Sequence, residues 1–176
     1  MTYYFKWTGC SIWRSSQPMN GILNNQNSDD ELMLREIAKT KSDNDPSQPE
    51  DFLDEMLQIY DARPKLNAQG NRLKGGGFED QRFYLNCDLT FCDIDNIHGV
   101  TKVFEKMQEI PLSPDNFASI QAYGPKVEES GYLQIISKIL KASNLIVQSI
   151  VEKRQNVLIH CSDGWDRTSQ LCSLSQ

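Results

Sequence analysis

The sequence predicts a single α/β domain over residues 1–176, with a sheet flanked by helices. A chain of 176 residues that is 39% hydrophobic is long and apolar enough for one domain with a core. Short apolar runs, typical of buried strands, alternate with longer runs whose apolar residues recur at helical intervals. The last apolar run leads through a glycine-containing loop into a helix, and open α/β folds bind ligands at such a strand end.

Three segments are predicted to be strands. Residues 56–60 are a short apolar run that ends at an Asp-Ala-Arg-Pro loop. Residues 87–94 alternate between apolar and polar side chains, as a half-buried strand does. Residues 157–160 are a second apolar run, placed directly before the loop of interest.

Helices are predicted over 99–110, where Pro111 ends the pattern, over 132–153 and over 166–173. The middle helix is the clearest, because its apolar residues recur at intervals of three and four and form a stripe that faces the core. The stripe consists of Leu133, Ile136, Ile139, Leu140, Ile146, Val147 and Ile150.

Two polar stretches, near 24–30 and 40–51, are predicted to be loops or insertions, since neither has apolar residues to bury. Between them, a short helix is expected to hold Leu32, Leu34 and Ile37, with Asp29 or Asp30 as its cap.

Composition excludes several functions. The formal net charge of −6 argues against a nucleic-acid partner and against a polybasic membrane surface. No segment approaches the ~18 consecutive apolar residues of a membrane span. The five cysteines are odd in number and form no C-x-x-C pair, so free thiols are expected, with Cys10, Cys87, Cys92 and Cys172 as inert apolar fillers. No spacing fits a zinc site, so neither a metal nor a cofactor is expected.

The segment from His160 to Thr168 carries the chemistry. Cys161 and Arg167 are separated by five residues, which can wrap a semicircle of backbone N–H groups around a tetrahedral phosphate, with Gly164 relieving the tight turn. Arg167 can bind two phosphate oxygens with its planar guanidinium. The same donors should lower the pKa of the Cys161 thiol and make it a nucleophile. The alternative is that Cys161 is an ordinary buried strand cysteine.

This segment resembles the signature of active myotubularins. Four other segments resemble other parts of the same family's sequences, in the order found in that family. These segments are residues 14–19 (Arg-Ser-Ser-Gln-Pro-Met), 61–68 (Asp-Ala-Arg-Pro, then Asn-Ala), 74–79 (Lys-Gly-Gly-Gly-Phe-Glu) and 95–98 (Asp-Asn-Ile-His). The resemblance implies a cysteine-phosphatase-like α/β fold and a phosphoinositide 3-phosphatase. Its substrates would be phosphatidylinositol 3-phosphate and phosphatidylinositol 3,5-bisphosphate.

By resemblance, Cys161 is the nucleophile and Arg167 stabilises the transition state. The headgroup site would be lined by Asn71, Asn96, Ile97, Ser162, Asp163, Gly164, Trp165, Asp166 and Arg167. The resemblance also implies a cytoplasmic protein, peripheral on endosomal membranes. Its partners would be a phosphoinositide at the membrane surface and, in a homo- or hetero-oligomer, other family members.

The two carboxylates of the loop repel phosphate but can accept hydrogen bonds from inositol hydroxyls. One of them can also protonate the leaving inositol oxygen, and Asp166 is the first choice, with Asp163 second. For both, helix capping is the alternative. Trp165 either stacks on the headgroup or packs in the core, and His98 and His160 are expected to be structural.

The chain departs from the family pattern at both ends. It ends soon after Arg167, where the family continues with further arginines, and it has no N-terminal lipid-binding domain of the GRAM type. A phosphatase domain incomplete at its C-terminus is therefore expected. Two other functions stay open: a catalytically deficient interaction or adaptor fragment, and a dual-specificity protein phosphatase.

Overall fold

The computed structural model of the chain describes residues 1–40, 55–110 and 117–176. Within these ranges the fold is mixed α/β, as predicted. No helix among them has the length and apolar character needed to cross a membrane.

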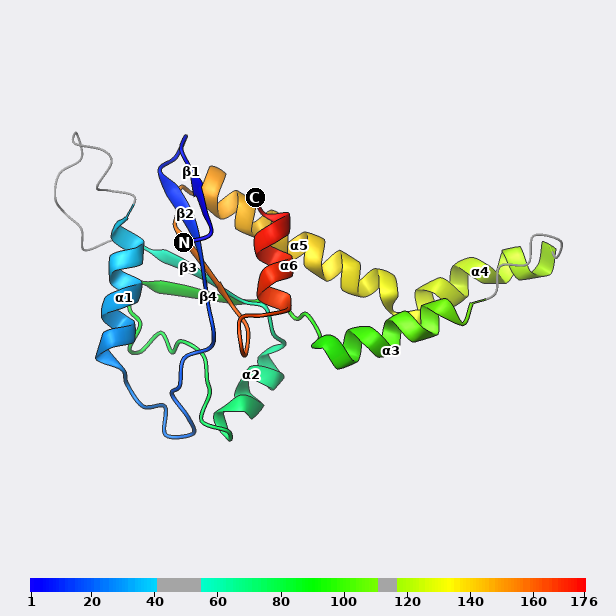
Figure 1. Ribbon diagram of the computed structural model, residues 1–176, viewed down its shortest axis with the longest axis horizontal. Helices are drawn as coiled ribbons and strands as arrows, with labels where there is room; N and C mark the ends of the chain where they lie inside the picture. Colours follow the sequence, from blue (N-terminus) through cyan, green and yellow to red (C-terminus); the bar gives the residue numbers. More distant parts are fainter. Residues whose placement is uncertain (41–54, 111–116) are drawn as a thin grey trace.

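Five strands form one sheet in the order β1-β2-β5-β3-β4 (Figure 1). Their bounds are Tyr3–Phe5 for β1, Cys10–Ser15 for β2, Leu57–Asp61 for β3, Cys87–Phe91 for β4 and Val157–His160 for β5. β1 is antiparallel to β2, and all other pairs are parallel. His160 pairs with Ser15 on one side and with Asp61 on the other. The carboxyl ends of three strands therefore meet at one edge of the sheet.

Six helices are described. They are α1 (Ser28–Lys39), α2 (Lys65–Arg72), α3 (Ile97–Gln108), α4 (Phe117–Ser130), α5 (Tyr132–Val151) and α6 (Arg167–Leu174). α1 covers one face of the sheet, and α5 and α6 cover the other (Figure 1). α3 and α4 lie against α5 and extend away from the sheet.

The central strand β5 is buried on both faces. Val157 and Ile159 pack in the core formed with α5 and α6, whereas Leu158 packs in the smaller core formed with α1. Successive side chains of a strand point to opposite faces of the sheet, so a strand buried on both sides must be apolar throughout. This explains the continuous apolar run seen in the sequence.

The three predicted strands are confirmed, the last with its predicted bounds and the other two with shifted ends. β4 ends at Phe91 rather than at Ile94, and Asp93 shortly after it has a left-handed φ of 56° that a strand cannot continue through. α3 begins at Ile97, before the predicted Gly99, because the Asn96 side chain accepts a hydrogen bond from the Gly99 N–H at 3.0 Å.

The prediction of a loop over 24–30 is wrong at its end, because α1 begins at Ser28. The cap is Asn27, whose side-chain oxygen accepts from the N–H groups of Asp29 and Asp30, and not one of these aspartates. The helix holds the three apolar residues predicted for it, of which Leu34 and Ile37 are buried and Leu32 is exposed. Residues 41–51 of the second polar stretch lie outside the described residues.

The predicted core stripe of α5 is correct in part. Ile139, Ile146 and Ile150 are buried, but Leu133, Ile136, Leu140 and Val147 are exposed. The buried face instead includes Ile135, Ala142, Ser143 and Ser149. Small residues allow α5 to approach its neighbours closely. The Tyr60 hydroxyl bonds the Leu145 carbonyl and the Ser149 hydroxyl at 3.0 Å each, and the Ser175 hydroxyl donates to the Ser143 carbonyl at 3.5 Å.

The buried side chain of Asn156 joins α1 to the sheet. Its oxygen accepts hydrogen bonds from the backbone N–H and the hydroxyl of Ser11, at 2.8 and 3.0 Å. Its nitrogen donates to the carbonyl oxygens of Ile37 and Ala38, at 2.9 and 3.0 Å, which lie in the last turn of α1. One side chain therefore satisfies backbone groups of two separate elements.

We expect Asn156→Ala to lower the free energy of unfolding by about 3 kcal/mol, because it leaves several buried polar groups without partners. Urea denaturation of the wild type and the variant measures this difference. Asn25→Ala, at an exposed asparagine, is the matched control. A loss no larger than that of the control would show that Asn156 does not hold the two elements together.

Candidate active site

The loop of interest starts where β5 ends. Cys161 directly follows His160 and is 3% exposed, and α6 begins at Arg167. The backbone N–H of Gly164 points back at the sulfur of Cys161, at 3.3 Å. The segment from 161 to 166 therefore curls around the sulfur as the spacing predicts.

Gly164 is required at its position for two reasons. Its φ of +76° lies in the left-handed region, which side chains rarely adopt. A Cβ atom there would lie 2.5 Å from the carbonyl oxygen of Ser15, well inside contact distance. The loop is thus packed directly against the end of β2.

The loop lowers the pKa of the Cys161 thiol. Burial alone would raise this pKa, but the hydroxyl and backbone N–H of Thr168, the N–H of Gly164 and the charge of Arg167 together outweigh burial. The Thr168 hydroxyl is buried and has no other hydrogen-bond partner among the described residues, which leaves its proton for the sulfur. By contrast, burial raises the pKa values of Cys87 and Cys92 to about 12. Cys161 is therefore suited to act as a thiolate.

His160 is structural, as predicted. Its Nε2 atom lies 3.0 Å from a carboxylate oxygen of Glu79, and its Nδ1 atom lies 3.3 Å from the carbonyl oxygen of Cys161. Burial alone would lower the pKa of His160, but the Glu79 carboxylate raises it from 6.5 to about 9. At neutral pH the ring is therefore protonated, and both nitrogens donate. His98, for which a structural role was also predicted, is exposed on α3, so that role stays a prediction.

A cavity of about 350 Å³ opens beside the loop. It is lined by Arg63, Asn67, Gly70, Asn71, Lys74, Asn96, Ser162 and Arg167. The structure thus brings together four of the predicted site residues, from α2, the start of α3, the loop and α6. Asn71 donates a hydrogen bond to the hydroxyl of Ser162 at 3.0 Å, which joins α2 directly to the loop.

The cavity has positive charge available for an anion. Arg167 is 8% exposed, and its nitrogens lie 3.4 Å from the Ile94 carbonyl and from the Ser162 hydroxyl. Within the described ranges, neither Arg167 nor Lys74 belongs to an ion pair. Both cations can therefore bind a phosphate group without first breaking a salt bridge.

Arg63, although it lines the cavity, is occupied by the scaffold. It forms a fully buried ion pair with Asp61, at 2.7 Å, and also donates to the Gly77 carbonyl at 2.7 Å and to the side chain of Gln17. Each of its three nitrogens has a partner within the protein. Arg63 therefore ties the glycine-rich segment to the end of β3 rather than binding a ligand.

The other predicted site residues do not line this cavity. Ile97 is 56% exposed in the first turn of α3, and Asp163, Trp165 and Asp166 lie exposed on the loop. The Asp166 carboxylate makes no capping hydrogen bond with α6, although Asp166 occupies the cap position, so the capping interpretation is wrong for it. Trp165 is 75% exposed, so its indole does not pack in the core of the described residues.

The sequence interpretation missed Lys74 and Asn67. Both belong to segments whose resemblance to the family was noted, 61–68 and 74–79, but neither was assigned to the headgroup site. The spacing of Asn67, Asn71 and Lys74 at helical intervals was the available signal, since it places the three residues on one face of a continuing turn.

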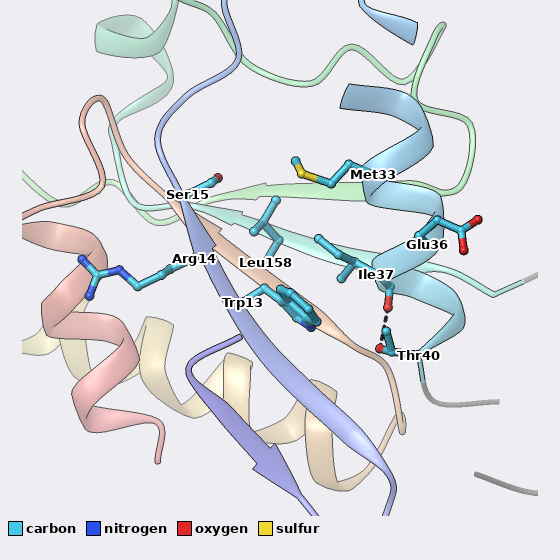
Figure 2. Close-up of a pocket in the computed structure, with 8 residues that line it drawn as sticks. All are labelled: Trp13, Arg14, Ser15, Met33, Glu36, Ile37, Thr40 and Leu158. Carbon is cyan, nitrogen blue, oxygen red and sulfur yellow. Dashed lines mark hydrogen bonds between the residues drawn. The ribbon is translucent and has the colours of Figure 1, made fainter. Parts of the chain in front are cut away.

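A second cavity, of about 310 Å³, lies on the α1 side of the sheet (Figure 2). It is lined by Trp13, Arg14, Ser15, Met33, Glu36, Ile37, Thr40 and Leu158, and none of these residues was predicted to bind a ligand.

The His160–Glu79 pair makes stability depend on pH. Because the folded pKa of about 9 exceeds the ordinary 6.5, the stabilisation is complete below pH 6.5 and is lost as pH rises through 9. We expect the free energy of unfolding to fall over this interval in the wild type and to fall much less in Glu79→Gln. Urea denaturation at a series of pH values measures it, with the exposed Glu36→Gln as control. Identical pH profiles for the wild type and Glu79→Gln would contradict the coupling.

Comparison with known proteins agrees with this site. A family model described as the myotubularin-like phosphatase domain matches residues 1–176. The chain is 37% identical over 175 residues to the phosphatidylinositol-3-phosphate phosphatase MTMR7 of Homo sapiens, covering 99% of this chain and 24% of the relative. It is 36% identical over 174 residues to the phosphatidylinositol-3,5-bisphosphate 3-phosphatase MTMR6 of Mus musculus, covering 99% of this chain and 26% of the relative.

A third relative is the myotubularin of Xenopus laevis, 35% identical over 165 residues, with 94% of this chain and 25% of the relative covered. The chain thus spans about a quarter of the length of the curated relatives that it matches. The family model covers every residue of the chain, including the loop around Cys161 and the residues that line the cavity beside it. The chain therefore belongs to the myotubularin-like phosphatase family.

Proposed function

We propose that this chain contains the catalytic centre of a phosphoinositide 3-phosphatase that acts through a phosphocysteine intermediate. The substrates are the 3-phosphates of phosphatidylinositol 3-phosphate and phosphatidylinositol 3,5-bisphosphate. The main support is the buried Cys161 thiol with its lowered pKa, next to a cavity lined by Arg167 and Lys74, two cations that form no ion pair with any residue that the structure describes. The names of the relatives support this substrate class.

Binding depends on the loop and on α2. The backbone N–H groups of the loop and the guanidinium of Arg167 bind the oxygens of the 3-phosphate. Asn71 holds the Ser162 hydroxyl in place at 3.0 Å, and Lys74 supplies a charge for a further phosphate of the headgroup. The exposed indole of Trp165 is available to stack on the inositol ring or to contact the lipid.

In the first step, the Cys161 thiolate attacks phosphorus and forms a P–S bond. The bond between phosphorus and the inositol oxygen breaks, and that oxygen leaves with the bonding electron pair. An inositol alkoxide is a poor leaving group, so it needs a proton, and Asp166 is the proposed donor, with Asp163 as the alternative. The carboxylate that results then stays at the mouth of the site.

In the second step, water attacks the phosphorus of the phosphocysteine and gives up a proton to that carboxylate. The P–S bond breaks, which restores the thiolate and releases inorganic phosphate. Charge on the phosphate oxygens is balanced by Arg167 and by the N–H groups in both steps. The thiolate is a better leaving group than an ordinary cysteine because its pKa is lowered.

The proposed location is the cytoplasmic face of endosomal membranes, where such lipids would be presented to the site. Assembly with other family members is part of the same proposal.

One observation favours the alternative of an interaction fragment: Leu133, Leu140 and Leu145 form exposed apolar surface on α5. Phosphate release from a soluble short-chain lipid separates these two functions.

Cys161→Ser should abolish phosphate release from short-chain phosphatidylinositol 3-phosphate while leaving phosphate binding largely intact. A hydroxyl is not ionised at neutral pH, whereas the N–H groups and Arg167 remain in place. Cys92→Ser, at a cysteine whose pKa is raised to about 12, is the matched control. Turnover by Cys161→Ser at the wild-type rate would rule out the covalent mechanism.

Asp166→Asn should lower turnover of the inositol lipid far more than turnover of para-nitrophenyl phosphate, because nitrophenolate leaves without a proton. A positioned acid contributes ~10²–10⁴-fold, so the two losses should differ by at least about tenfold. The measurement is kcat/KM for both substrates, with Asp88→Asn, an exposed aspartate on β4, as control. Equal losses on both substrates would assign the proton to Asp163 or to water.

A further inference from the structure

We infer that Arg14 is a positioning residue for the catalytic loop, and that it fixes the direction of the backbone N–H groups that bind phosphate. It acts from outside the loop together with the residues that follow β2. The inference rests on the proposed function for its catalytic meaning, but the contacts that carry it are independent of any substrate.

The guanidinium of Arg14 is hydrogen-bonded to the loop and to α6. Its Nη2 atom donates to the carbonyl oxygen of Gly164 and, at 2.9 Å, to the hydroxyl of Ser169 on α6. No ion pair with a carboxylate is formed by Arg14 among the residues that the structure describes. In Figure 2 its side chain extends from β2 toward α6, away from Met33, Glu36 and Ile37 on α1.

A second contact from the same segment acts in the same way. The backbone N–H of Gln17 donates to the carbonyl oxygen of Ser162 at 3.1 Å. The segment from Arg14 to Gln17 therefore binds two carbonyl oxygens of the loop, one near its start and one near its end. The register of β2 against β5, in which Ser15 pairs with His160, brings the segment alongside the loop.

These two bonds determine where the neighbouring N–H groups point. In a trans peptide unit the C=O and N–H bonds point in opposite directions. Holding the Ser162 carbonyl toward β2 turns the N–H of Asp163 away from β2, and holding the Gly164 carbonyl does the same for the N–H of Trp165. The N–H of Gly164, which lies between them, points at the Cys161 sulfur. Alternate peptide units are thus held from outside, which leaves the N–H groups of Asp163 and Trp165 available to a phosphate bound at the sulfur.

The loop lies so close to the end of β2 that a movement of one would displace the other. Gly164 approaches Ser15 so closely that a single added carbon would lie 2.5 Å from the Ser15 carbonyl oxygen. Without the guanidinium, the Gly164–Trp165 peptide unit loses a charge-assisted hydrogen bond and can rotate. Rotation would turn a donor away from the phosphate and a carbonyl oxygen toward it, which weakens binding of the anion and destabilises the thiolate.

The test compares Arg14→Met and Arg14→Lys with the wild-type chain. Methionine keeps most of the aliphatic stem but has no donor, whereas lysine keeps a charged donor without the second arm of the guanidinium. Arg35→Met, at an exposed arginine on α1, is the matched control. Two properties are measured without turnover: the Kd for tungstate, by titration calorimetry, and the apparent pKa of Cys161, from the pH dependence of its alkylation by iodoacetamide.

We expect Arg14→Met to weaken tungstate binding on the order of tenfold, the effect of one charge-assisted hydrogen bond. The apparent pKa of Cys161 should rise in the same variant, and Arg14→Lys should restore part of both properties. Arg35→Met should change neither. Wild-type tungstate affinity and an unchanged thiol pKa in folded Arg14→Met would overturn the inference, because a purely structural role would lower only the melting temperature.

A variant that does not fold and a wild-type chain that does not hydrolyse the lipid lead to different conclusions. If Arg14→Met does not fold, Arg14→Lys decides: weaker tungstate binding at an ordinary melting temperature supports the inference, and wild-type binding contradicts it. If the wild-type chain binds tungstate but does not hydrolyse the lipid, the proposed function fails, while the effect of Arg14 on the loop is still measured.

Discussion

The structure depends on the register of three parallel strands, β2, β5 and β3. His160, the last residue of β5, pairs with Ser15 on one side and with Asp61 on the other. The segments that follow these strands therefore leave the sheet at the same level and lie against each other. The loop around Cys161 follows β5, the segment from Arg14 to Gln17 at the end of β2 lies beside that loop, and α2 reaches the cavity from β3. A slip of one residue in either pairing would separate these groups and reverse the faces of the strand.

Two buried ion pairs hold the segments that this register brings together. Arg63 and Asp61 join the end of β3 to Gly77, and His160 and Glu79 join the end of β5 to the same glycine-rich segment. A buried pair costs desolvation energy, and its net contribution to stability is small or negative unless all its hydrogen bonds are made. Here each side-chain nitrogen of Arg63 and each ring nitrogen of His160 has a partner within the protein, which favours a fixed geometry of the site. That rigidity suits a loop whose N–H groups must be in place before phosphate binds.

The loop separates its charges by burial. Arg167 and the Cys161 sulfur are buried at its base, whereas Asp163 and Asp166 are exposed at its rim. In the proposed reaction, a phosphate bound at the base would meet cations and N–H groups, and the two exposed carboxylates would be left for the rest of the headgroup. This arrangement reconciles an acidic loop with an anionic ligand.

Much of the site could be predicted from the sequence, because its elements are local. The spacing of Cys161, Gly164 and Arg167 after an apolar run defines a strand, a loop and a helix within a few residues, and the structure has all three. The long helix α5 was predicted for the same reason. Its buried face was predicted only in part, since apolar residues lie on two faces of the helix, and the burial of Ala142 and Ser143 marks the face that packs in the core. β1 and β2 were also missed, because β2 has a mixed pattern and finds its partner far along the chain.

The contacts from outside the loop were decided by tertiary structure alone. Arg14 is 150 residues from Gly164, and Asn71 is 91 residues from Ser162, so no local pattern links either pair. Lys74 likewise enters the cavity only because β3 lies beside β5 and delivers α2 to the same edge. The sequence by itself determined which residues can do the chemistry, since reactivity depends on side-chain type and on short spacing. Strand order and register decided which distant residues hold them in place, because pairing between strands depends on the whole sheet.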